Sequence, residues 1–163
     1  MTADLLRHFY EYHFSENRSL WNTYVVPLSQ EQYLAEVDYS IGSVRHHLVH
    51  MASVDRTWFT ELRGLDIPEP LNPAQFADRE TLRARWDHIE AEMRAYLANL
   101  RDDMLNSKPI IDEEDQDLTV GQVLLHVVNH GTDHRAQLLR LLNGFGLKTV
   151  SQDYIFYVYD NPT

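Results

Sequence analysis

Apolar residues recur at intervals of three and four positions in four long stretches of the chain. These stretches cover residues 3–24, 41–62, 78–100 and 119–143. Such spacing is the period of one face of an α-helix, so each stretch predicts an amphipathic helix. No region is convincingly rich in strand patterns. The sequence therefore predicts an all-α fold, a four-helix bundle.

Residues that favour helix ends stand at the borders of these stretches. Ser40 is placed to cap the second helix and Asp78 to cap the third. Thr119 and Gln122 form a capping-box pair at the start of the fourth, and Gly144 follows it as a natural C-terminal stop. The caps thus support three of the four elements that the periodicity predicts.

The connections are predicted to hold only short elements. A capping-box pair begins at Ser29 and predicts a short helix through Val37. The polar segment 101–118 is predicted to be a loop, with room for a small hairpin of residues 108–111 against 117–119.

The aromatic tail, residues 153–159, has a pattern that fits neither a helix nor a strand. Because a segment so rich in aromatic side chains gains by burial, it is predicted to pack back onto the bundle. Aromatic residues left exposed there and in the first helix would favour a homodimer, which light scattering can test.

Composition narrows the possible functions. A chain of 163 residues predicts one domain, 1–163. The formal net charge of −11 argues against nucleic acid and anionic membrane surfaces as partners. The absence of cysteine excludes disulfides, zinc–thiolate sites and a cysteine nucleophile. No apolar run approaches membrane-spanning length and no signal sequence is visible, so a cytoplasmic location is expected.

Histidines recur every four residues in the fourth helix, at His126, His130 and His134. Residues at this spacing stack along one side of a helix, where two imidazoles can face one metal ion. Taken alone, such a pair is more often an ordinary set of hydrogen-bonded or exposed histidines. A second histidine group on the second helix strengthens the metal hypothesis, because bundle metal sites are built from facing helices.

The second helix offers three histidines as a further ligand: His46, His47 and His50. At about 100° per residue, His47 lies within the apolar side, His50 beside it and His46 opposite. The helical wheel mildly prefers His47 and leaves His50 open. Asp55 also lies on the apolar side, either to orient a ligand histidine or to meet a polar interface.

Two blocks of sequence resemble the DinB-like (DNA-damage-inducible) family, within the wider DinB/YfiT type. One is residues 43–59, and the other is residues 125–139, which resemble the family's Asn-His-x3-His-Arg-x-Gln block. The resemblance implies a four-helix bundle, a homodimer and one divalent metal ion, zinc or nickel. Carried over by position, it implies the metal ligands His50, His130 and His134. His126 is then expected to flank the site.

Three functional hypotheses follow from the resemblance and the histidine pattern. The first is a metal-dependent enzyme, either a hydrolase or a thiol-cofactor-dependent transferase with a small-molecule or thiol substrate. The second is a non-catalytic metal-binding module of the stress response. The third is a plain dimeric helical bundle without metal. The sequence identifies neither a general base nor a substrate.

Overall fold

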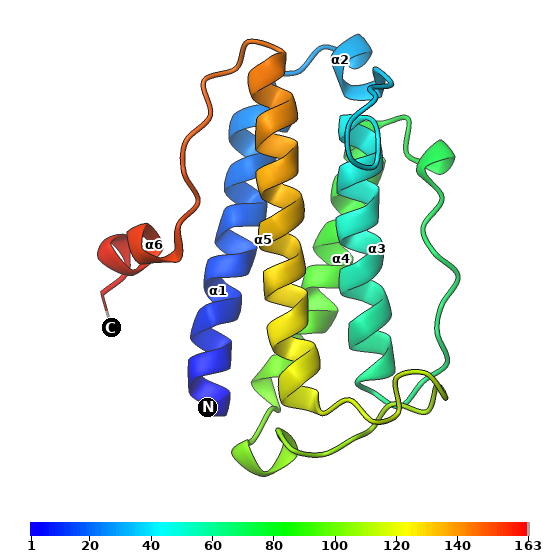
Figure 1. Cartoon of the computed structure of the whole chain (residues 1–163), viewed down its shortest axis with the longest axis vertical. Coiled ribbons are helices and arrows are strands. Elements are labelled where there is room, and N and C mark those ends of the chain that lie inside the picture. Colours follow the sequence, from blue (N-terminus) through cyan, green and yellow to red (C-terminus); the bar gives the residue numbers. More distant parts are fainter. Residues whose placement is uncertain (163) are drawn as a thin grey trace.

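The computed structural model describes residues 1–162, and in this range it contains helices and no strands (Figure 1). The long helices are α1 (Ala3–Leu20), α3 (Val44–Glu61), α4 (Arg79–Ala98) and α5 (Val120–Gly144). A π-helical turn, Trp21–Val25, extends α1, and α2 (Gln30–Leu34) and α6 (Tyr154–Asp160) are short. The predicted all-α class and four-helix bundle are confirmed.

The order of the helices gives α5 two long neighbours. In Figure 1, α1 and α5 run upward while α3 and α4 run downward. The connection of residues 62–78, which joins α3 to α4 in the sequence, runs back up the outside of the bundle. The helix α5 packs against α1 on one side and α3 on the other. Any site between α3 and α5 therefore forms from antiparallel helices.

Most predicted helix starts are confirmed, but the cap of α3 is not. Thr119 and Ser29 each form the predicted capping box, and Asp78 caps α4. The cap of α3 is Ser43, whose side chain accepts from the His46 amide, rather than Ser40. Ser40 has φ of 51°, a left-handed conformation that a helix start cannot use.

The prediction of a hairpin in the connection before α5 is wrong. The structure shows turns in place of the hairpin of residues 108–111 and 117–119. The carbonyls of Leu105 and Ser107 instead accept from the amides of Gly121 and Val120, at 2.9 and 3.0 Å. They thus pair N–H groups in the first turn of α5 that have no partner within the helix. The helix α5 ends at Gly144, where the sequence predicts its end, and the left-handed glycine after the helix is Gly146, with φ of 87°.

The tail packs back on the bundle as predicted, and it does so as the helix α6. The Tyr154 ring meets Phe9 and Tyr12 edge-on at centroid distances of 5.2 and 5.3 Å. The opposite face of α6 leaves Ile155 and Phe156 about half exposed. The homodimer stays a prediction. Within residues 1–162, no helix combines the length and apolarity that a membrane span requires.

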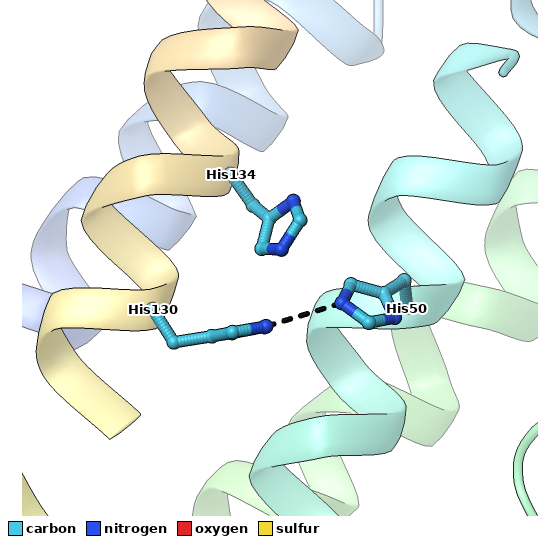
Figure 2. A group of neighbouring side chains, drawn as sticks. All are labelled: His50, His130 and His134. Carbon is cyan, nitrogen blue, oxygen red and sulfur yellow. Dashed lines mark hydrogen bonds between the residues drawn. The ribbon is translucent and has the colours of Figure 1, made fainter. Parts of the chain in front are cut away.

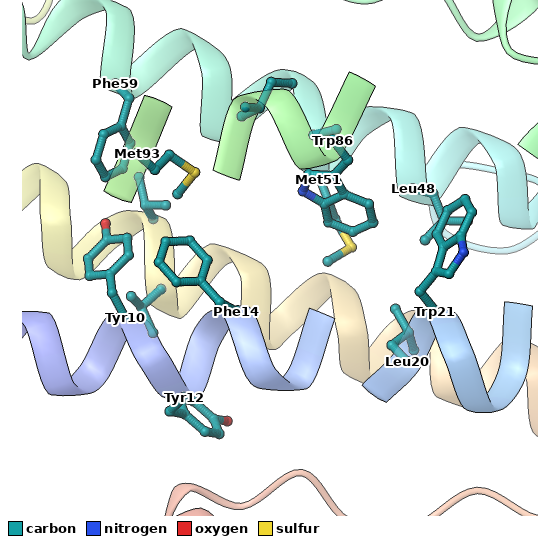
Figure 3. Close-up of a cluster of buried hydrophobic side chains, with 14 of the residues drawn as sticks. Tyr10, Tyr12, Phe14, Leu20, Trp21, Leu48, Met51, Phe59, Trp86 and Met93 are labelled. Carbon is teal, nitrogen blue, oxygen red and sulfur yellow. The ribbon is translucent and has the colours of Figure 1, made fainter. Parts of the chain in front are cut away.

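The core lies along the bundle axis and is rich in large side chains (Figure 3). The Tyr10 ring packs edge-on to Phe59 at 5.6 Å, and its hydroxyl donates to the Leu124 carbonyl at 2.9 Å. Trp86 of α4 meets Trp21 at 6.3 Å. Because burying such a side chain contributes about 1.5–3 kcal/mol, these contacts hold the four helices together.

A buried polar cluster ties α5 to α1. The Arg135 side chain is 1% exposed, and its guanidinium donates to Asn17 Oδ1 at 2.9 Å and to Gln152 Oε1 at 2.6 Å. Its Nη1 also lies 3.2 Å from His13 Nδ1. Arg135 therefore braces the bundle.

Asp55 belongs to this cluster rather than to the histidine site. Its carboxylate accepts from the Trp86 indole at 3.3 Å and lies 3.7 Å from His13 Nε2. Of the two alternatives for Asp55, the structure shows the polar interface. The carboxylate is buried, with the Trp86 indole of α4 as its hydrogen-bond donor and His13 of α1 beside it.

Replacing Gly131 by alanine should destabilise the protein, by about 1–3 kcal/mol, because overpacking a core is unfavourable. A Cβ at this position would stand 2.5 Å from His13 Cε1 and 3.1 Å from Arg135 Nη1. The matched control is Gly144→Ala in the same helix, where a Cβ meets nothing within 4 Å. The control should be neutral or stabilising, by at most about 1 kcal/mol. Urea unfolding followed by circular dichroism measures both, and equal effects would contradict the close packing at Gly131.

Glu61 should make stability fall as the pH rises towards neutrality. It is 2% exposed and one carboxylate oxygen has no hydrogen-bond partner. Burial raises its pKa to about 7, and the charges of Asp115 and Asp112 add to the rise. The native state therefore keeps the proton of Glu61 up to about pH 7, whereas the unfolded chain releases it at about pH 4.3. The free energy of unfolding therefore falls as the pH rises between these two values.

Glu61→Gln removes this titration while keeping the shape of the side chain. Its stabilisation relative to the unchanged protein should therefore be larger at about pH 8 than at about pH 5. Urea unfolding at both pH values measures the difference, and a pH-independent effect would show that the Glu61 carboxyl is not protonated in the native state.

Candidate metal centre

Three imidazoles from two helices meet between α3 and α5 (Figure 2). His130 and His134 stand one turn apart on α5, and His50 faces them from α3. Each offers one ring nitrogen, and these three nitrogens lie within 4.8 Å of one another. Among the histidine and carboxylate side chains of residues 1–162, these three form a group whose spacing suits a metal ion.

The distances within the group are those of rings turned towards one centre. The ring centroids of His130 and His134 are 4.3 Å apart, and that of His50 lies 5.0 and 4.5 Å from them. The Nε2 atoms of His50 and His130 are 3.1 Å apart. Two nitrogens on one tetrahedral zinc ion are about 3.3–3.4 Å apart, for bonds of about 2.0–2.1 Å. The pair is thus close to the spacing of two metal ligands.

The surroundings keep these imidazoles suited to binding a cation. Burial lowers the pKa of His130 to about 4, and the neighbouring imidazoles of His134 and His50 add to the shift. Burial also lowers the pKa of His50. A metal ligand must be the neutral imidazole, so these shifts reduce competition from protons near neutral pH. All three side chains are partly exposed, which leaves the group open on one side.

The chemistry of the donor set also fits a metal ion. The ring of His134 faces the other two imidazoles with one nitrogen, and its Nδ1, on the far side of the ring, is buried without a hydrogen-bond partner. Three imidazole nitrogens are a donor set for zinc, nickel, copper or iron, with no thiolate needed. The residues present therefore fit a divalent transition metal.

The remaining histidines of the two helices stay outside this group. His47 is fully buried, and its Nδ1 donates to the Ser43 carbonyl at 3.1 Å. His46 Nδ1 lies 2.8 Å from the Ser43 hydroxyl. The preference of the helical wheel for His47 is not realised, because the wheel finds the most buried position whereas the group forms at the edge of the α3–α5 contact.

His126 flanks the group, as expected, and it has an aromatic partner that sequence reasoning missed. Its exposed ring lies 5.7 Å from the His130 ring and meets Trp58 edge-on at 5.3 Å. Trp58 is only partly buried. Eight residues are about two helical turns, so in the antiparallel pair Trp58 lies near the level of His126, which is two turns before His134.

The sequence matches the DinB family over residues 1–162. The chain belongs to the DinB family. It is also similar to Protein DinB of Bacillus subtilis (strain 168), with 26% identity over 169 residues, covering 99% of this chain and 98% of that protein. Family membership and the three-histidine group both fit a metal-binding DinB-like protein.

Proposed function

We propose that this DinB-family protein binds one divalent transition-metal ion through His50, His130 and His134. The observation that carries the proposal is the convergence of three ring nitrogens from two helices, with the Nε2 atoms of His50 and His130 only 3.1 Å apart. Zinc or nickel is the ion that the family resemblance implies. Imidazole ligands suit zinc, nickel, copper and iron alike, so availability in the cell decides among them.

We further propose that the centre serves a metal-dependent enzyme, a hydrolase or a thiol-dependent transferase. Three protein ligands leave coordination positions for a small molecule, which is the arrangement of catalytic rather than structural sites. Such an ion supplies Lewis acidity, which makes a bound water or thiol easier to deprotonate. Because the chain has no cysteine, a thiol at this centre must come from outside the protein.

His130→Ala should abolish or strongly reduce bound metal, because it removes one of three ligands and leaves too few to compete with water. The matched control is His126→Ala, one turn earlier on the same helix, which should keep the metal content unchanged. Elemental analysis of protein purified without a histidine tag measures both. Loss of metal from the His126 variant together with retention in the His130 variant would show that the ligand assignment is wrong.

A thiol-dependent enzyme should let a small thiol reach the metal. Adding a low-molecular-weight thiol to the Co²⁺-loaded protein should produce sulfur-to-cobalt charge-transfer absorption, and the His130→Ala variant should not show it. Turnover assays with thiols and electrophiles, and with ester and amide substrates, then separate a transferase from a hydrolase. Metal binding with neither thiol binding nor turnover would instead support the non-catalytic module.

A further inference from the structure

His47 is a fully buried histidine whose hydrogen bonding is only half complete. Its Nδ1 lies 3.1 Å from the Ser43 carbonyl oxygen, which can only accept. The hydrogen of the neutral ring must therefore sit on Nδ1. This leaves Nε2 as a bare acceptor, and Nε2 is buried without a partner.

His134, on the facing helix α5, also has a buried ring nitrogen without a hydrogen-bond partner. Figure 2 shows one ring nitrogen of His134 directed towards His50 and His130, while the other points away from them. The nitrogen without a partner is Nδ1, and it is buried. If Nε2 takes the metal ion, Nδ1 carries the hydrogen of the neutral ring and needs an acceptor. Leaving such a group unsatisfied costs about 1–3 kcal/mol.

The two rings belong to facing helices, and no hydrogen bond joins them in the structure. His47 precedes His50 by one turn of α3, and the rings of His50 and His134 are 4.5 Å apart. Burial is the main cause of the lowered pKa of His47, and the imidazole of His134 adds to the shift.

The acceptors that usually support a metal-bound histidine are engaged elsewhere. Within residues 1–162, no carboxylate is hydrogen-bonded to the three imidazoles of the centre: Asp55 accepts from Trp86, and Asp133 accepts from Gln137 at 3.0 Å. Support for metal ligands normally comes from such a second hydrogen bond, which sets the tautomer and the ring orientation. The Nε2 of His47 is a buried side-chain acceptor on the facing helix that has no partner.

We infer that His47 is a positioning residue of the metal centre, whose Nε2 accepts a hydrogen bond from His134 Nδ1–H when the ion is bound. The inference rests on the proposed metal binding. A metal ion at Nε2 of His134 would fix the hydrogen of that ring on Nδ1. The Nδ1–H group of His134 would then have a donor's need for an acceptor, and the unpaired Nε2 of His47 would meet it. His47 contributes to metal affinity without touching the ion.

Two variants at position 47 separate the acceptor from the bulk of the side chain. His47→Leu keeps an apolar side chain of similar size and removes the acceptor, whereas His47→Gln keeps an acceptor oxygen near the place of Nε2. The matched control is His46→Gln on the same helix, because the His46 ring is partly exposed and bonds the Ser43 hydroxyl.

Competition of the metal-stripped proteins with a chelator for Zn²⁺ measures affinity. His47→Leu should bind about 10–100-fold more weakly, the usual effect of losing such support. His47→Gln and His46→Gln should stay close to the unchanged protein. Equal affinity of folded His47→Leu and the unchanged protein would overturn the positioning role while leaving the metal site intact. Absence of zinc binding by the unchanged protein would overturn both.

Nitrogen-15 NMR of the unchanged protein tests the same inference without a variant, and it decides if His47→Leu does not fold. In the zinc-loaded protein, His134 should show a protonated Nδ1 that exchanges slowly and a metal-bound Nε2. A His134 ring that binds zinc through Nδ1, or a rapidly exchanging Nδ1–H, would overturn the inference.

Discussion

The placement of α5 depends on the burial of one charged group, the guanidinium of Arg135. A charge that is 1% exposed is tolerable only when polar partners surround it. Asn17 of α1, Thr132 of α5 itself and Gln152 of the C-terminal segment supply those partners. Because the same guanidinium bonds all of them, α1, α5 and the tail cannot shift independently without leaving it unsatisfied.

The packing of α5 against α1 also sets the direction in which the histidines of α5 point. Gly131 and Arg135 each follow a histidine of the centre by one residue, which is about 100° around the helix. Holding these two positions against α1 therefore turns His130 and His134 towards α3. The small residue at 131 has a matching reason, since His13 fills the place where a side chain would begin. One orientation of α5 about its axis thus places the polar cluster against α1 and the candidate metal ligands towards α3.

The local parts of this fold could be predicted from the sequence, and the long-range parts only in outline. Helical periods and the capping boxes at Ser29 and Thr119 are determined by neighbours a few residues apart, so they were confirmed. The hairpin failed because the carbonyls of Leu105 and Ser107 serve the first turn of α5. The partners of Asp55 lie on α1 and α4, and no spacing within α3 could reveal them.

The difference between His47 and His50 shows why burial is a poor guide to a ligand. A ligand must reach an ion that also meets solvent or substrate, so its ring belongs at the edge of a helix contact, as that of His50 does. A ring in the interior can satisfy its hydrogen bonds only through neighbouring groups, and His47 has one of its two. The helical wheel locates the interior position correctly, but the interior ring of His47 is not the one that meets His130 and His134. An ion bound only by the folded protein would add to the stability of the arrangement that brings α3 and α5 together.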